Sequence, residues 1–248
     1  LGRACGTSGG LLARGGEQEG DGGFVEVSGK TDLRFRGQVD LTAPRGASGT
    51  LLLDPTNITI SNGSGDGGGD GNTTFAGTPS GIVGSVLSTD TGPTTIYESE
   101  MEGLGATVNI VLQATNDITI NDLTDNMLSL TATTGSLTIR ADADGDGAGT
   151  FTMNTGDTIR TQGGAVSIRG ASISALGPID TTGSAGDAGG AVTLTADNGG
   201  ITVSSTITST GGSNANGGAV TIAATGAASV AGTITTTGGT FVAGNPGR

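Results

Sequence analysis

The sequence predicts an all-β protein that folds as a solenoid, and three observations lead to this fold class. Apolar and polar residues alternate over about four to six residues at a time, as at Val25 and Val27 or Ile58 and Ile60, which is typical of short half-buried strands. No stretch of comparable strength has the helical period. A Gly-Gly-Ala-Val motif begins at Gly163, Gly189 and Gly217, spaced 26 and 28 residues apart, and such self-similarity indicates stacked repeats.

The N-terminal block, up to Ile60, consists of short alternating segments separated by Gly, Ser and Pro. Its predicted strands are marked by the pairs Val25 and Val27, Leu33 and Phe35, Val39 and Leu41, Leu51 and Leu53, and Ile58 and Ile60. Glycine accounts for 50 of 248 residues, aromatic residues for 2% and hydrophobic residues for 33%. There is no triplet period, so collagen is excluded. A thin aliphatic core repeated along an axis suits this composition, because it needs no large side chains.

Residues 61–105 interrupt the pattern. Residues 62–72 are almost entirely Gly, Asp, Asn and Ser, which predicts a surface loop. Residues 94–104 contain the one helix-like piece, a turn or two long, with Gly103 as its stop. We therefore expect a single domain over residues 1–248, with coils at 1–60, a loop excursion containing a short helix at 61–105, and repeat coils at 106–248.

Regular alternation resumes at Thr107 and continues into the glycine-marked repeats. Each repeat offers about three short strands between Gly or Asn turns, which suits one triangular coil, and another Gly-Gly begins at Gly238, 21 residues after Gly217. With strands about 4.8 Å apart, roughly ten coils would form a rod on the order of 50 Å long. The residues predicted to point inward are Val166, Ile168, Ile173, Ile179, Val192, Leu194, Ile201, Val203, Ile207, Val220, Ile222, Val230 and Ile234.

Several segments resemble one protein family. They read Gly-Gly-Phe-Val-Glu-Val-Ser-Gly-Lys at residues 22–30, Phe-Arg-Gly-Gln-Val-Asp-Leu-Thr-Ala-Pro at 35–44, Leu-Leu-Leu-Asp-Pro-Thr-Asn-Ile-Thr-Ile at 51–60 and Val-Leu-Gln-Ala-Thr-Asn-Asp-Ile-Thr-Ile at 111–120. Together they resemble the filamentous-haemagglutinin-like adhesins of Gram-negative bacteria. The resemblance implies a right-handed parallel β-helix exported to the cell surface, commonly by two-partner secretion. The secretion domain of such proteins is not recognisable here, so we expect an internal piece of a longer chain.

Charge narrows the set of partners. The net charge is −13, and Lys30 is the only lysine, so phosphate backbones and anionic lipids would be repelled and nucleic-acid binding is not expected. No apolar run approaches the length of a membrane span, so no membrane insertion is expected. Cys5 is the one cysteine, which leaves no internal disulfide framework.

Asp142, Asp144 and Asp146, followed by Gly147, are the best candidate metal ligands. Alternate carboxylates on a tight turn can converge on Ca²⁺, but the twelfth position is Met153, where an EF-hand has a glutamate. The alternative is a solvated acidic turn between two coils. Asp66 and Asp70 form a weaker candidate without the tandem nonapeptide of a calcium β-roll.

Candidates for catalysis and modification are few. The chain has no histidine, which removes the usual general base and main zinc ligand. The one local cluster of carboxylates and arginines consists of Asp32, Arg34, Arg36 and Asp40, and its alternation with apolar residues favours exposed strand faces, so no enzyme is expected. Sequons occur at Asn57, Asn62 and Asn72. The threonine-rich residues 206–210 and 233–237 suggest an ice-binding surface as a further interpretation. The threonine positions shift between repeats, which argues against it.

The expected function is therefore structural. The chain is interpreted as a stiff rod of a secreted bacterial surface protein that displays loops, chiefly residues 61–105, to glycans or proteins of cells or matrix. The alternative is a subunit of an extracellular filament formed by end-to-end stacking of β-helices. A polysaccharide-acting β-helix enzyme is the third interpretation.

Overall fold

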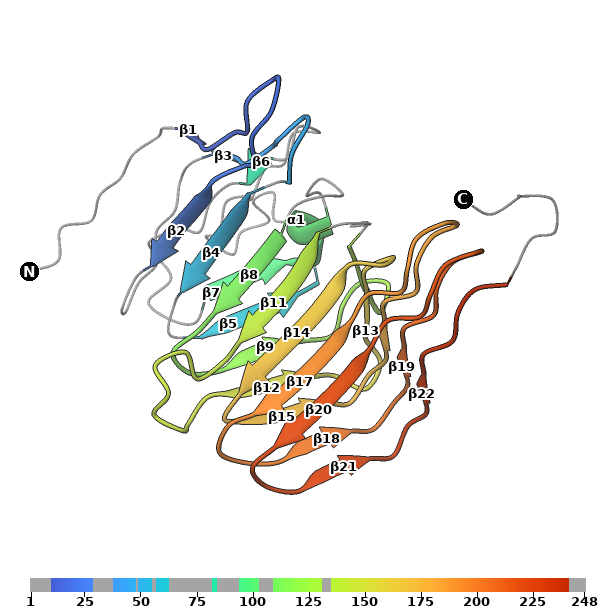
Figure 1. The fold of residues 1–248 in the computed structure, drawn as a ribbon. Helices are drawn as coiled ribbons and strands as arrows, with labels where there is room; N and C mark the ends of the chain where they lie inside the picture. The colour runs from blue at the N-terminus through green and yellow to red at the C-terminus, as the bar shows by residue number, and fades with distance from the viewer. Residues whose placement is uncertain are drawn as a thin grey trace, which may run out of the picture.

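The computed structural model describes residues 10–28, 38–47, 49–54, 57–62, 82–83, 94–102, 109–130 and 135–240. In this part of the chain, short strands from successive turns stack in register into three parallel sheets, which run side by side along one axis (Figure 1). The protein is thus nearly all-β and forms a parallel β-helix, as the sequence predicted.

The two longer sheets contain seven strands each. The first sheet consists, in spatial order, of β2 (Phe24–Ser28), β4 (Thr50–Asp54), β8 (Asn109–Gln113), β11 (Ser136–Arg140), β14 (Ala165–Gly170), β17 (Val192–Ala196) and β20 (Val220–Ala224). The second sheet consists of β7 (Thr94–Tyr97), β5 (Ile58–Ser61), β9 (Ile118–Ile120), β12 (Thr150–Met153), β15 (Ser172–Ala175), β18 (Ile201–Val203) and β21 (Ala228–Val230).

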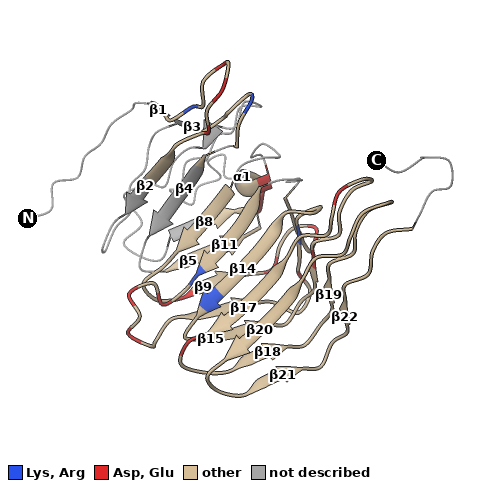
Figure 2. Ribbon diagram, in the orientation of Figure 1, with Lys and Arg blue, Asp and Glu red and all other residues tan. Residues whose placement is uncertain are grey.

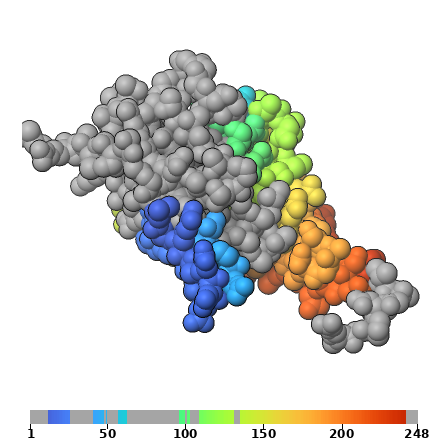
Figure 3. All heavy atoms as spheres, turned by 90° about the horizontal axis from the view of Figure 1, so that it is seen from above, coloured from blue at the N-terminus to red at the C-terminus, as the bar shows by residue number. Residues whose placement is uncertain are grey.

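The third sheet is shorter and begins later in the chain. It consists of β10 (Met127–Ser129), β13 (Thr158–Arg160), β16 (Ile179–Asp180), β19 (Ile207–Thr208) and β22 (Ile234–Thr235). A separate minor sheet joins β1 (Gly10–Leu12), β3 (Gln38–Asp40) and β6 (Ile82–Val83), with β3 and β6 antiparallel. Seen from above, the coloured coils follow one another from green to red across the molecule (Figure 3).

In the described part of the chain, each of the two longest sheets contains seven stacked strands, beside the roughly ten coils predicted for the whole sequence. Part of the N-terminal block pairs in the minor sheet instead of adding coils to the main stack. In addition, Thr50 of β4 pairs directly with Asn109 of β8, so no described strand between them belongs to the first sheet.

Alternation along each strand creates the core. In β8, β11 and β17, for example, buried aliphatic residues alternate with half-buried ones, because successive side chains of a strand point to opposite faces. Nine of the predicted inward residues, from Val166 to Ile207, are buried. Val220 and Ile222 are only partly buried, and Val230 and Ile234 are exposed. The latter four lie in β20, β21 and β22, on which no further described strand stacks.

The glycine-marked repeats stack on one another, since Val166 pairs with Val192 and Val192 with Val220. A side chain on Gly190 would collide with the carbonyl oxygen of Gly164 in the preceding coil, which explains why glycine recurs there. The pair at Gly238 does not continue this series. A side chain on Gly239 would instead meet the carbonyl oxygen of Gly212, so this pair stacks on the turn at residues 211–212.

The segment predicted to be helix-like divides into a strand and a helix. Thr94–Tyr97 forms β7, which pairs with β5 at the edge of the second sheet, and Glu98–Glu102 forms α1. Glu98 accepts hydrogen bonds from the backbone N–H of Thr124 at 3.1 and 3.2 Å, and Glu102 accepts one from Ser129 N–H at 2.7 Å. Glu102 therefore supplies an acceptor to β10, the edge strand of the third sheet, where a preceding strand would otherwise pair, and Glu98 supplies one to the turn before β10.

Candidate functional site

The acidic loop follows β11 and leads into β12. The carboxylates of Asp142, Asp144 and Asp146 approach one another, so that one oxygen from each lies within 4.8 Å of the others. Asp142 is buried with a left-handed backbone, φ 57°, and its carboxylate accepts a hydrogen bond from Gly147 N–H at 3.0 Å. The structure thus brings together the three predicted ligands.

The geometry of this loop fits Ca²⁺ in one respect. Oxygen ligands lie about 2.4 Å from Ca²⁺, so two ligands on opposite sides of the ion are about 4.8 Å apart. The remaining ligands of a site with six to eight oxygens would be backbone carbonyls or water. Asp144 and Asp146 are exposed. A solvated acidic turn that binds no ion would have the same arrangement of carboxylates.

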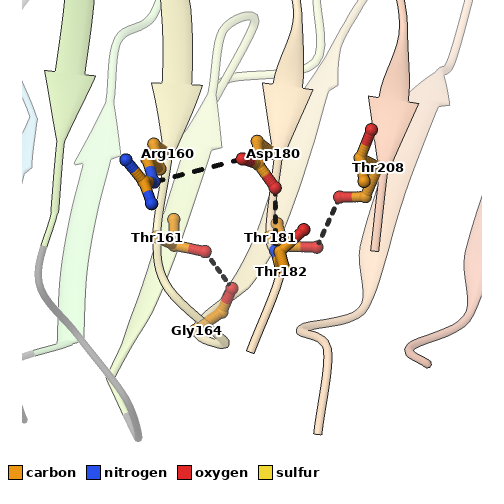
Figure 4. Close-up of polar contacts among 7 residues, drawn as sticks. All are labelled: Arg160, Thr161, Gly164, Asp180, Thr181, Thr182 and Thr208. Carbon is orange, nitrogen blue, oxygen red and sulfur yellow. Dashed lines mark hydrogen bonds and ion pairs between the residues drawn. The ribbon is translucent and has the colours of Figure 1, made fainter. Parts of the chain in front are cut away.

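Three polar side chains directly follow strands of the third sheet, and two of them, Thr161 and Thr181, are drawn in Figure 4. Thr161, Thr181 and Ser209 are buried. The Thr161 hydroxyl donates to the carbonyl of Gly164 at 2.5 Å, and the hydroxyls of Thr181 and Ser209 both donate to the carbonyl of Gly190 at 2.6 Å. Each hydroxyl satisfies a turn carbonyl, so this internal row is structural.

Two ion pairs cross between coils on the outside. Arg169 donates two hydrogen bonds to Asp197, one of them from Nη2 at 3.0 Å, and the hydrogen bonds and charge of Asp197 raise the pKa of Arg169. The Nε atom of Arg160 lies 4.0 Å from Oδ2 of Asp180 (Figure 4). Both arginine side chains are about half exposed, so these pairs are typical of surface contacts.

Asp157 is the most buried carboxylate in the described part of the chain. It is 0% exposed, and its Oδ1 accepts a hydrogen bond from Leu123 N–H at 3.0 Å. Its Oδ2 has no partner within the described residues. The carboxylate of Asp157 thus links two successive coils through this hydrogen bond, which indicates a structural role.

A hollow of about 520 Å³ lies on the outer face of the second sheet, over β5, β9 and β12. Apart from Ile120, the residues that line it are polar, namely Ser61, Asn62, Thr119, Asn121, Asp122, Thr152 and Asn154. This hollow was not predicted from the sequence. A signal was present, because the middle residue in strands such as Ile-Thr-Ile is a threonine or serine, but the alignment of these residues depends on register.

The sequons fall in different surroundings. The Asn57 side chain is half-buried, and its oxygen accepts hydrogen bonds from Asn116 Nδ2 and Asp117 N–H, each at 3.0 Å. Asn62 is exposed at the hollow.

The threonine-rich strands also align, since Thr208 pairs with Thr235 and the hydroxyls of Thr210 and Thr237 lie 3.4 Å apart, but this alignment covers only two coils.

Several predicted residues lie outside the described part of the chain. These are Cys5, Lys30, Asp32, Arg34, Arg36, Asp66, Asp70 and Asn72. Asp40 belongs to β3. The carboxylate and arginine cluster and the second calcium candidate therefore remain predictions.

Charged residues gather in the loops and on a few strand ends, whereas the sheets are mostly uncharged (Figure 2). Among the described residues, no helix is both long enough and apolar enough to cross a membrane. Comparison with protein-family models, with curated proteins and with solved structures gives no match.

Proposed function

We propose that this chain is a structural, adhesive rod of a secreted bacterial surface protein of the filamentous-haemagglutinin-like kind. The observation that carries the proposal is the unbroken stack of coils from β8 to β20, which share one aliphatic core. A stack of this kind is quasi-one-dimensional and extends by repetition. Its work is to hold binding surfaces away from the cell, in contact with glycans or proteins of cells or matrix. The proposal includes no catalytic step.

Adhesion of the isolated chain tests this function. Beads coated with the full chain should bind epithelial cells or extracellular matrix more strongly than beads coated with a chain in which the core is disrupted by Leu194→Asp. Leu194 is 0% exposed, so an unpaired charge there should unfold the coils. Equal binding by the two preparations would overturn the proposal, because adhesion would then not need the folded rod.

A second candidate function is a filament formed by end-to-end stacking, and a specific observation favours it. The exposed large hydrophobic residues of the described chain are Leu12, Phe24, Val230 and Ile234. Phe24, Val230 and Ile234 lie in β2, β21 and β22, the strands at the two ends of the stack, and Leu12 lies in β1 at the edge of the minor sheet. Unpaired sheet edges at an end are templates for another chain. Head-to-tail contacts that do not close generate filaments.

Light scattering and negative-stain imaging distinguish the two functions. Stacking predicts fibres of uniform width that lengthen with concentration, and a double variant Val230→Lys, Ile234→Lys should abolish them by charging the C-terminal face. A monodisperse monomer at high concentration would reject the filament and leave the display rod in place.

For the acidic loop we propose Ca²⁺ binding that stiffens the turn between β11 and β12. Titration calorimetry with calcium chloride should detect a site in the parent chain that is lost in Asp144→Ala. Asp187→Ala, in the turn of another coil, is the matched control and should bind as the parent does. Equal heats for the parent and Asp144→Ala would reject the site, and unchanged fibres after chelation would separate calcium from assembly.

A further inference from the structure

We infer that the hollow on the outer face of the second sheet binds an uncharged oligosaccharide. This inference rests on the proposed adhesive function and names the ligand class and the surface that takes it. The hollow is an open depression of about 520 Å³ on the sheet surface, which suits a ligand that lies along the surface rather than one enclosed in a pocket.

The lining supplies both donors and acceptors of hydrogen bonds. Hydroxyls come from Ser61, Thr119 and Thr152, amides from Asn62, Asn121 and Asn154, and one carboxylate from Asp122. Hydroxyl and amide groups each donate and accept, and a carboxylate accepts from two directions. Neighbouring hydroxyl groups of a sugar ring also donate and accept, so the lining matches such a ligand in the kind of hydrogen bond that it offers.

Part of this lining is not engaged by the protein itself. Ser61 donates to Asn62 at 3.5 Å, and Asn154 accepts from Thr155 N–H at 2.8 Å. Within the described part of the chain, the side chains of Asn121 and Asp122 have no such partner. They are exposed and therefore available to a ligand without breaking an existing bond.

The hollow lies on a longer row of hydroxyls that runs along the solenoid. Register places one outward residue of each successive strand in line, in the order Thr59, Thr119, Thr152, Ser174, Thr202 and Ser229. Strands stack about 4.8 Å apart, which is close to the length of one sugar unit in an extended chain. A linear oligosaccharide lying along the axis would therefore meet a hydroxyl at each unit.

These hydroxyls are held rigidly. Ile118 and Ile120 flank Thr119, Phe151 and Met153 flank Thr152, and all four flanking side chains are at most 1% exposed. Anchoring on both sides of each threonine fixes its direction, so little order is lost when a ligand binds. At the N-terminal edge, Tyr97 pairs in register with Ser61 and places one aromatic residue beside the row.

Charge determines which sugars fit. None of the seven strands of the second sheet contains a charged residue, and Asp122 is the single charge in the lining. With no arginine or lysine in the hollow and a net charge of −13, sialylated, sulfated or uronic sugars would be repelled. Glycoside hydrolysis commonly uses two carboxylates, so the geometry points to binding rather than cleavage.

The test begins with the full chain on an array of neutral oligosaccharides (glucose, galactose and N-acetylglucosamine oligomers) beside sialylated and sulfated ones. The best neutral ligand is then titrated into the parent and into a double variant, Thr119→Val, Thr152→Val. Valine keeps the β-branched shape and strand propensity, so the fold should be retained. Loss of two hydroxyls should weaken binding about tenfold, since each neutral hydrogen bond contributes a factor of a few.

Thr193→Val is the matched control, because Thr193 is a half-buried threonine on β17 of the first sheet. It should bind as the parent does, and Asp122→Asn should reduce the discrimination against sialylated sugars. Absence of binding to every neutral oligosaccharide, or equal affinity of parent and double variant, would overturn the inference.

Cell adhesion separates this inference from the proposed function. If the double variant adheres to cells as well as the parent, the rod remains adhesive and the hollow is not its sugar site. If the parent binds neutral oligosaccharides through the hollow but adheres to no cell or matrix, the sugar site stands and the adhesive function fails.

Discussion

The repeats at residues 189–194 and 217–222 differ only in their last residue, leucine in one and isoleucine in the other, yet their burial differs. Val192 and Leu194 are 0% exposed, whereas Val220 and Ile222 are only partly buried. The same contrast holds in the third sheet, where Ile207 is 0% exposed and its register partner Ile234 is 42% exposed.

This contrast teaches that a coil of this protein does not bury its own core. Each inward side chain is covered by the coils on both sides of it, as expected for a solenoid whose stability is a sum of repeat and interface contributions. The same motif is thus a core element in an inner coil and a surface in an end coil.

The largest expected effect comes from truncating the same residue in the two positions. Ile207→Ala should destabilise the protein by about 2 to 5 kcal/mol through lost burial and a cavity. Ile234→Ala should cost about 0.5 kcal/mol or less, because its side chain already contacts water. Urea unfolding of both variants measures the difference. Equal losses would mean that another chain covers the end coil in solution and would support stacking.

Removal of the buried carboxylate should have the next largest effect. Asp157→Ala leaves the N–H of Leu123 without its acceptor inside the fold, which costs about 1 to 3 kcal/mol. Asp187→Ala, in an outer turn, is the control with little expected change. A midpoint of thermal unfolding for Asp157→Ala equal to that of the parent would show that water replaces the carboxylate.

The N-terminal edge of the third sheet sharpens the comparison, because α1 covers it and no described element covers β22. Glu102→Ala removes the acceptor for Ser129 N–H and should cost about 1 kcal/mol. The expected readout is faster hydrogen exchange at Ser129 in the variant. If exchange at Ser129 is unchanged, α1 does not protect this edge.

A smaller effect is expected for the ion pair on the outer face of inner coils. Arg169→Gln should cost about 0.2 to 1 kcal/mol, since both partners are exposed. The difference from the parent should shrink in high salt, which screens exposed charges. A difference that does not change with salt would mean that the packing of Arg169, rather than its charge, stabilises the coils.

The smallest effect concerns pH. Burial raises the pKa of Glu102, the hydrogen bond from Ser129 partly offsets this, and the nearby charges of Asp125 and Glu98 raise it further. The folded state therefore binds this proton more tightly than the unfolded state, so stability falls as pH rises from the ordinary glutamate pKa through the raised one. Glu102→Gln should lack this decline, and urea unfolding at acidic and neutral pH measures it. A decline of equal size in Glu102→Gln would place its origin in other groups.

Much of the fold was predictable because strand formation here is local. The alternation at Val166 and Ile168 or at Val192 and Leu194 predicts which residues are buried, and these residues are buried. The recurrence of Gly-Gly-Ala-Val likewise predicts stacking, and the valines of this motif pair in register. The three aspartates of the acidic loop are close in sequence, so it could also be predicted that their carboxylates lie close together.

The sequence by itself determined the all-β class, the short strands, the repeat and the shortage of charge on the strands. Only the tertiary structure decided which coils contact each other, because turns of unequal length set the register between distant strands. That register pairs Gly239 with the turn of Gly212, gives Leu123 the carboxylate of Asp157, and aligns Thr119 with Thr152 beneath one hollow. It also leaves Ile234 exposed where Ile207 is buried, since burial depends on the neighbouring coils and not on the repeat alone.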